Sequence, residues 1–243
     1  MKENVVRLSK LMSDRGLCSR READAYIAAG QVIVNGEVVS KLGTKVSLDV
    51  EIAFKDQAQA KQEGKITIIL NKPVGYVSTQ PEKGYIAAIE LIRPENQFSD
   101  GNLILQPGHR KNLNVAGRLD IDSKGLLVFS QDGTVVRKII GPDSGMEKEY
   151  IVGVEGLITR QVIQKLCYGL TLDGKMLKRA VVEALGPNLL RFILQEGKKR
   201  QIRRMCEIVN LKVIKLKRVR VGKVLLGNLP EGQWRFLGAH EHF

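Results

Sequence analysis

The chain has 243 residues, 43 % of them apolar, which is enough for one large domain or two unequal domains with buried cores. It carries 39 Lys and Arg against 26 Asp and Glu, a net charge of +13. Such an excess usually means a polyanionic partner such as nucleic acid. There is no apolar run of about 18 residues and no signal-peptide core, so we expect a cytoplasmic protein that does not act on membranes.

The cysteine and histidine content argues against a metal site. Cys18, Cys167 and Cys206 are odd in number and widely spaced, unlike a disulfide framework or a cysteine-based zinc site. Two of the three histidines, His240 and His242, lie in the C-terminal tail. The common glycine-rich nucleotide motifs are absent. We therefore expect no metal, no nucleotide and no organic cofactor.

Residues 5–54 are predicted to form a small helical and β-hairpin unit. A first helix is expected over 8–15. Ser19 followed three residues later by Glu22 is a capping box, which predicts the start of a second helix. That helix should end at Gly30, since glycine commonly follows the last helical turn.

A hairpin follows the second helix. Asn35-Gly36 stands between two β-branched segments and favours a type I′ turn. A further short strand is expected over 50–54. Residues 55–65 are polar and lack aliphatic periodicity, so we interpret them as a linker.

Residues 66–243 are predicted to form a larger α+β unit with a mixed, mostly antiparallel sheet, because hairpin patterns alternate with helical ones. A long irregular loop with one short helix is expected over 80–114. Strands are expected over 66–70, 126–130, 149–154, 189–195, 213–221 and 234–237, helices over 134–140, 159–167 and 199–209, and a hairpin joining 170–172 to 177–184 through Asp173-Gly174.

Positive charge is concentrated near the C-terminus. Residues 191–223 hold twelve basic and two acidic side chains. A charge run is usually a solvated face. Here it falls on an expected helix and strand, where unpaired like charge costs stability unless a polyanion meets it, which favours phosphate binding. Arg20 and Arg21 lie in the first turn of a capped helix, where cations are disfavoured unless they face phosphates; ordinary solvated arginines are the alternative.

The N-terminal pattern resembles the S4 RNA-binding domain over about residues 5–53. The matching residues are Arg7-Leu8 with Lys10, the segment Cys-Ser-Arg-Arg-Glu-Ala at 18–23, and Val32 with Val34-Asn35-Gly36.

The larger part resembles the bacterial pseudouridine synthase family typified by RsuA, over about residues 66–237. The motifs are Leu-Asn-Lys-Pro at 70–73, Gly-Arg-Leu-Asp-Ile-Asp-Ser-Lys-Gly-Leu-Leu at 117–127, Glu-Lys-Glu-Tyr at 147–150, and Gln-Ile-Arg-Arg-Met at 201–205. Within the family, residues 147–150 and 203–207 are most similar to the RluF branch, which acts on 23S rRNA.

The resemblance implies that uridine is isomerised to pseudouridine without a cofactor. It makes Asp120 the catalytic carboxylate, although a lone loop aspartate is more often a turn residue. It places Arg203 beside Asp120, where a guanidinium would keep the carboxylate ionised; phosphate binding is the alternative for Arg203. Tyr150 would stack on uracil and hold or move a proton; core packing with Val152 and Val154 is its alternative.

The same resemblance implies an RNA-binding set. Arg118 would fill the space left by a flipped-out base, and Lys72 would be structural or face a phosphate. The full set expected to contact RNA is Arg7, Lys10, Arg20, Arg21, Lys72, Arg118, Arg200 and Arg204.

The expected function is therefore site-specific pseudouridine formation in ribosomal RNA, with 23S rRNA as the expected partner and the protein acting as a monomer. The same chemistry on 16S rRNA or another RNA is an alternative. A second is a non-catalytic RNA-binding assembly factor. The presence of Asp120, Tyr150 and Arg203 together favours the enzyme.

Overall fold

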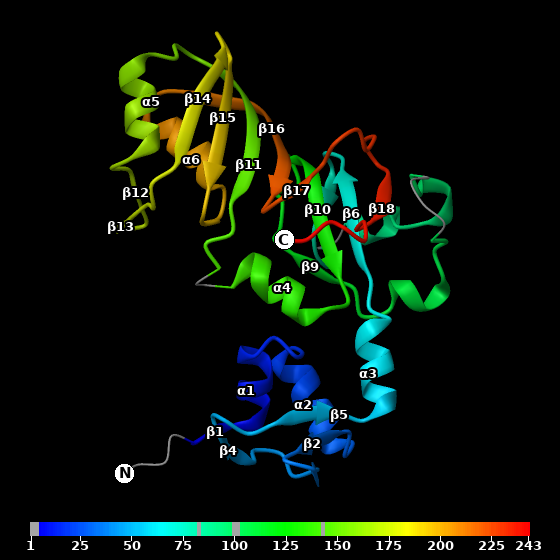
Figure 1. Ribbon diagram of the computed structural model, residues 1–243. Helices are drawn as coiled ribbons and strands as arrows, with labels where there is room; N and C mark the ends of the chain where they lie inside the picture. Colours follow the sequence, from blue (N-terminus) through cyan, green and yellow to red (C-terminus); the bar gives the residue numbers. More distant parts are fainter. Residues whose placement is uncertain (1–4, 82–83, 99–102, 142–143) are drawn as a thin grey trace.

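A computed structural model describes residues 5–81, 84–98, 103–141 and 144–243. Figure 1 shows a small N-terminal unit joined through helix α3 to a larger unit built on one sheet. The elements of the small unit are β1 (Val5–Arg7), α1 (Leu8–Asp14), α2 (Arg20–Ala28), β2 (Val32–Val34), β3 (Glu37–Val39), β4 (Lys45–Ser47) and β5 (Ile52–Phe54).

The local signals in the small unit are confirmed. The Ser19 side chain accepts a hydrogen bond from the Glu22 amide at 3.3 Å, and the Glu22 carboxylate accepts from the Ser19 amide at 2.9 Å. Asn35 and Gly36 both have positive φ, 48° and 84°, as a type I′ turn requires. The pairing of β1 with β4 was not predicted, because neither three-residue strand has a distinctive pattern.

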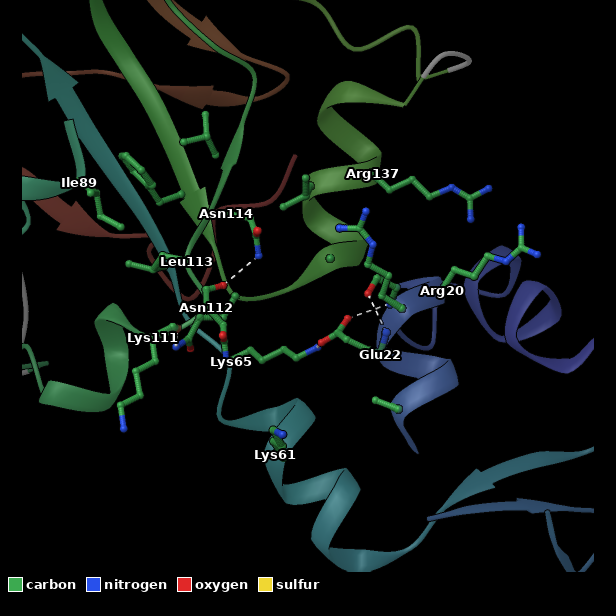
Figure 2. A pocket seen from close by; sticks show the side chains of 18 of the residues that line it. Arg20, Glu22, Lys61, Lys65, Ile89, Lys111, Asn112, Leu113, Asn114 and Arg137 are labelled. Carbon is green, nitrogen blue, oxygen red and sulfur yellow. Dashed lines mark hydrogen bonds and ion pairs between the residues drawn. The ribbon is translucent and has the colours of Figure 1, made fainter. Parts of the chain in front are cut away.

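The expected linker contains a helix, α3 (Asp56–Glu63). Seven of its eight residues are Ala, Gln, Lys or Glu, which favour helix. Ala58 is buried in the core of the small unit, and Gln62 donates to the Tyr26 hydroxyl at 3.0 Å. Figure 2 shows Lys65, just beyond α3, reaching the Glu22 carboxylate on α2. The segment is therefore packed against the small unit, which its lack of aliphatic periodicity did not reveal.

The larger unit contains a nine-stranded sheet in the order β14-β15-β11-β16-β10-β6-β18, with β17 paired to β16 and β9 to β10. The mixed, mostly antiparallel sheet is confirmed. The strands are β6 (Thr67–Lys72), β9 (Asn114–Ala116), β10 (Lys124–Ser130), β11 (Lys148–Glu155), β14 (Val181–Gly186), β15 (Leu189–Leu194), β16 (Lys212–Val221), β17 (Val224–Leu225) and β18 (Trp234–Phe236).

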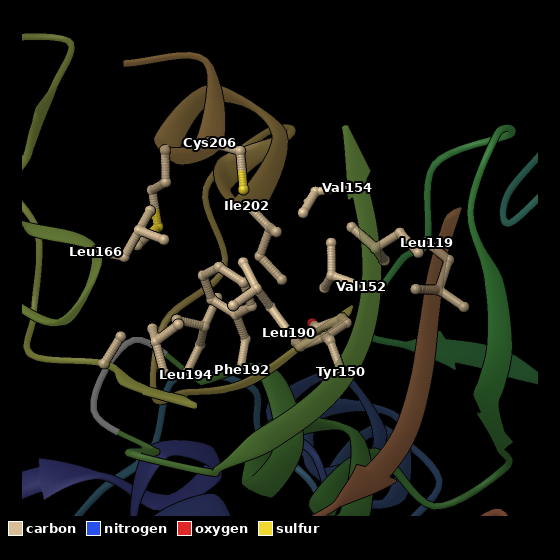
Figure 3. Close-up of a cluster of buried hydrophobic side chains, with 14 of the residues drawn as sticks. Leu119, Tyr150, Val152, Val154, Leu166, Leu190, Phe192, Leu194, Ile202 and Cys206 are labelled. Carbon is tan, nitrogen blue, oxygen red and sulfur yellow. The ribbon is translucent and has the colours of Figure 1, made fainter. Parts of the chain in front are cut away.

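Helices α4 (Gly133–Ile140), α5 (Arg160–Cys167) and α6 (Gln201–Ile208) pack on the sheet. Side chains alternate between two cores: Leu127 and Phe129 of β10 face one, Leu126 and Val128 the other. Ile139 of α4 belongs to the second core, while α5 and α6 contribute to the first. Figure 3 shows side chains of α5, α6, β11 and β15 meeting in that first core.

Two loop regions differ from expectation. The expected strand over 177–184 begins only at Val181, and a separate two-residue pair, β12 (Thr171–Leu172) with β13 (Lys175–Met176), forms the hairpin tip. The described part of 80–114 contains β8, β9 and three 3-10 turns rather than one short helix. The three turns are Ala88–Leu91, Pro94–Asn96 and Pro107–Arg110. Strand β8 (Ile86–Ala87) pairs with β7 (Tyr76–Val77), which lies just before this region.

A short parallel junction connects the two halves of the sheet. Strands β10 and β16 pair over only two positions, Lys124 with Lys217 and Gly125 with Arg218. Gly125 has φ of 104°, and a Cβ there would lie 2.2 Å from the Arg218 carbonyl oxygen. Only glycine permits this approach of the two strands.

We predict that Gly125→Ala destabilises the protein by about 2 kcal/mol or more, because it adds both a steric clash and an unfavourable φ. Chemical denaturation measures the change. Gly186→Ala is the control, since a Cβ there meets nothing within 4 Å. Equal stability of the two variants would contradict the importance of the junction.

Candidate active site

A cavity of about 650 Å³ lies at this junction and is lined from both halves of the sheet. One side is the loop between β9 and β10, and the other consists of β11, β16 and the start of α6. Five of the predicted site residues line it together: Arg118, Asp120, Tyr150, Arg200 and Arg203. Residues separated by more than 80 positions in the sequence thus meet in one cavity.

On one side, the loop that carries Asp120 is held by hydrogen bonds to its backbone groups. The Ser78 hydroxyl donates to the Leu119 carbonyl at 2.6 Å and accepts from the Leu119 amide at 2.9 Å. The Gly75 amide donates to the Ile121 carbonyl at 2.8 Å. The Ser78 hydroxyl and the Gly75 amide both belong to the segment that follows β6. The motif at residues 70–73 therefore directly precedes the segment that holds the Asp120 loop in place.

Arg218 supports the start of the same loop from β16. Its side chain is buried, and it donates to the Leu126 carbonyl at 2.7 Å and the Gly117 carbonyl at 2.8 Å, with a longer contact of 3.4 Å to the Arg118 carbonyl. From the sequence alone, Arg218 is one member of the basic segment at 191–223. Its position two residues after the buried Leu216, on the inward face of an alternating strand, was the available signal.

Arg203 does not form the expected ion pair with Asp120 in this structure. Its Nη2 donates to the Asp122 carbonyl at 2.9 Å and lies 3.3 Å from the Asp122 carboxylate and 3.4 Å from the Ser123 hydroxyl. Arg200 binds the other carboxylate oxygen of Asp122 at 3.0 Å. The start of α6 therefore contacts the loop at Asp122, two residues beyond Asp120. The sequence motif alone did not show which of these two carboxylates the arginine would bind.

One donor of Arg203 remains unused. The residue is only 8 % exposed, and its Nε has no hydrogen-bond partner among the described residues. Asp120 is half-buried and likewise has no side-chain hydrogen bond or ion pair within the described chain. A buried donor without a partner is costly, so the cavity has a place for an additional acceptor.

Tyr150 fits both interpretations offered by the sequence. It is 9 % exposed, belongs to the first core with Val152 and Val154, and also lines the cavity. Figure 3 shows Tyr150 on β11 in the same cluster as Leu119 and Ile202. Its hydroxyl has no recorded protein partner in the described chain, so the ring is held by packing while the polar end is available.

Of the two roles predicted for Lys72, the structure fits the structural one and not the RNA contact. It is fully buried, and its amine donates at 2.8 Å to the carbonyls of Pro73 and Tyr76, so it is not placed to contact RNA. Burial lowers its pKa to about 8, although the charges of Asp122 and Asp120 act in the opposite direction. Lys148, at the cavity wall, has its pKa lowered to about 8 by the same cause and binds the Ile139 and Met146 carbonyls.

Much of the basic segment at 191–223 is paired internally, contrary to the expectation of uncompensated charge. Cross-strand acids account for several pairs, because Glu149 lies opposite Arg220 and Glu183 opposite Arg191. Six of the twelve basic side chains form ion pairs: Arg191, Arg200, Arg203, Arg204, Lys212 and Arg220.

The remaining predicted RNA contacts are dispersed. Arg204 forms a two-contact pair with Asp173 at 2.6 and 2.9 Å, and Lys10 pairs with Asp14. Arg7 is exposed on β1, away from the residues that line the cavity. Arg20 and Arg21 are exposed on α2 and line a second, larger cavity.

The described residues contain no group of three or more His, Cys, Asp or Glu side chains arranged to hold a metal ion. Among the described helices, none combines the length and apolarity needed to cross a membrane.

Comparison with known proteins agrees with this geometry. The sequence model of the RNA pseudouridylate synthase family matches residues 66–208, which include Asp120, Tyr150 and Arg203. The chain belongs to this family. The S4 domain model matches residues 6–52, which confirms the expected N-terminal RNA-binding domain.

Similar proteins of the synthase family cover nearly the whole chain. The dual-specificity RNA pseudouridine synthase RluF of Escherichia coli K12 is 36 % identical over 237 residues, 97 % of this chain and 76 % of RluF. An uncharacterized RNA pseudouridine synthase of Aquifex aeolicus is 34 % identical, covering 97 % and 92 % of the two chains. A crystal structure of a pseudouridylate synthase matches with a TM-score of 0.65, 26 % identity and 96 % coverage of each chain.

Arg218→Lys is predicted to lower the turnover number of this RNA pseudouridine synthase at least about tenfold, because a lysine cannot reproduce the forked donation that fixes the loop. Single-turnover kinetics at saturating RNA measure the effect. Arg220→Lys, two residues along β16 and outside the cavity lining, is the control. Equal rates would show that Arg218 does not position the loop.

Lys72 should also make stability pH-dependent. The folded protein releases the Lys72 proton near pH 8, whereas the unfolded chain holds it up to about 10.5. Unfolding therefore takes up a proton between these values, and the free energy of unfolding should rise with pH relative to a Lys72→Met variant. Urea unfolding at pH 7, 8, 9 and 10 measures this difference. Parallel curves for wild type and Lys72→Met would contradict it; an exposed control, Lys165→Met, should run parallel.

Proposed function

We propose that this synthase isomerises one uridine of ribosomal RNA, in 23S rRNA, with Asp120 acting on a nucleotide flipped out of its stack. The observation that carries the proposal is the meeting of Asp120, Tyr150 and Arg203 in one cavity. The similarity of residues 147–150 and 203–207 to the RluF branch supports the 23S target. The E. coli relative is named as dual-specific, so 16S rRNA or another RNA is the second candidate substrate.

The reaction needs a nucleophile or base in a confined site. The bond between C1′ and N1 of uridine breaks, the uracil turns, and C5 bonds to C1′. The C5 proton is lost and N1 gains one, so the atoms balance without an external reagent. Asp120, half-buried and without a protein partner in the described chain, is available for attack or proton removal at the sugar or uracil.

The other two residues would act around Asp120. The Arg203 Nε can donate to a uracil oxygen or to the Asp120 carboxylate once substrate enters, which would satisfy its unused donor. The Tyr150 ring is held in the core and can stack on the turning base, while its hydroxyl can hold or move a proton.

Two arginines at the cavity suit the surrounding RNA. Arg118 is exposed in the lining, where a guanidinium can occupy the space left by the extruded base. Arg200 is exposed in the same lining and shares Asp122 with Arg203, so it can exchange that partner for a phosphate.

Asp120→Ala is expected to lower pseudouridine formation at least about a thousandfold on transcribed 23S rRNA, with RNA affinity within about twofold of wild type. Tritium release from C5-labelled uridine measures turnover, and filter binding measures affinity. Asp49→Ala, an exposed carboxylate in the small domain, is the control. Turnover by Asp120→Ala would overturn the assignment. In a parallel reaction, modification of transcribed 16S rRNA but not of 23S rRNA by wild type would move the substrate to the second candidate.

A further inference from the structure

A second cavity, of about 1770 Å³, lies between the S4 domain, α3 and the synthase domain (Figure 2). Its walls come from α2, α3, the segments at 78–81 and 108–115, and α4. We call it the interdomain groove. None of the predicted catalytic residues lines it.

Close contacts fix the two domains that form the groove. A Cβ at Gly133, the first residue of α4, would lie 2.3 Å from the Ser19 Cβ at the start of α2, so the two helix starts touch. Arg137 of α4 donates to the Ser13 hydroxyl at 2.6 Å and to Asp14 at 3.0 Å. The groove is therefore a defined surface, whose shape depends on docking of the S4 domain.

The groove carries cations without matching acids. Arg20, Arg21, Lys61 and Lys111 are exposed, and none pairs with an acid among the residues that the structure describes. The two acids in the lining, Glu22 and Glu90, are already paired with Lys65 and Arg110. Figure 2 shows Arg20, Lys61 and Lys111 on three different elements around the groove.

Between these cations the lining is partly apolar. Ile89, Leu113, Val115 and Val136 contribute to it. Cations spaced around apolar side chains suit a strand whose phosphates and unstacked bases are both exposed.

The groove is continuous with the catalytic cavity. Thr79, Val115, Ile140 and Gly141 line both. A uridine bound beside Asp120 is part of an RNA strand, so its neighbouring nucleotides must lie close to the catalytic cavity. The shared wall allows these nucleotides to lie in the groove, next to the S4 domain.

We propose that the interdomain groove binds the single-stranded RNA segment adjoining the target uridine, with Lys61 of α3 and Lys111 of the synthase domain contacting its phosphates. This proposal rests on the proposed function, since it assumes that the catalytic cavity receives a uridine. It assigns RNA binding to α3 and to the 108–115 segment, neither of which carries a recognisable motif.

Lys61→Gln/Lys111→Gln tests the proposal. Two lost phosphate contacts on a single strand should reduce the slope of log affinity against log salt by about 1.4 and weaken binding about tenfold at physiological salt. Filter binding of transcribed 23S rRNA at salt concentrations between about 50 and 200 mM gives both the salt slope and the affinity. The matched control is Lys165→Gln/Lys215→Gln, two exposed lysines outside both cavities.

The outcomes separate this proposal from the catalytic one, because pseudouridine is measured in the same reactions. A smaller slope and weaker binding for the groove variant only, with turnover at saturating RNA unchanged, supports the groove. If both double variants bind alike while wild type forms pseudouridine, the groove proposal is overturned and the proposed function stands. Weaker binding by the groove variant, without pseudouridine from wild type, supports RNA binding in the groove and rejects 23S rRNA as the substrate.

Discussion

The candidate active site depends on one close approach, where Gly125 of β10 passes the backbone of Arg218 on β16. Glycine lets the two halves of the sheet meet, and the Arg218 side chain then reaches carbonyl groups at the start of the Asp120 loop. Arg203 binds the far end of that loop. Two buried guanidiniums are tolerable because carbonyl and carboxylate oxygens surround them. Together they fix the backbone on both sides of Asp120.

This arrangement separates structural from functional charge. Arg203 and Arg200 share Asp122, and the cross-strand pairs of β11, β15 and β16 neutralise much of the basic segment. The cations without acid partners in the described chain that line the interdomain groove are on α2, α3 and the 108–115 segment. The net positive charge therefore indicates a polyanionic partner, although six of the twelve cations in the densest segment already have acid partners among the described residues.

Local chemistry made much of the fold predictable. The Ser19–Glu22 capping box, the Asn35-Gly36 turn and the alternating strand at 148–155 each specify their structure within a few residues. Four motifs predicted Asp120, Tyr150 and Arg203 as the candidate catalytic residues, and one cavity brings these three side chains together. The features that could not be predicted depend on contacts between residues distant in sequence. They are the burial of Lys72, the hydrogen bonds from Arg218 to the start of the Asp120 loop, and the pairing of Arg203 with Asp122 instead of Asp120. A polar helix such as α3, buried only through Ala58, has too little apolar periodicity to reveal its packing.

The most direct test of the account is a pseudouridine map of 23S and 16S rRNA from cells that lack this protein, complemented with wild type or with Asp120→Ala. We predict that one pseudouridine disappears from 23S rRNA and that only the wild-type protein restores it. Restoration by Asp120→Ala, or the loss of no site in either RNA, would contradict the central claim that Asp120 performs this isomerisation on ribosomal RNA.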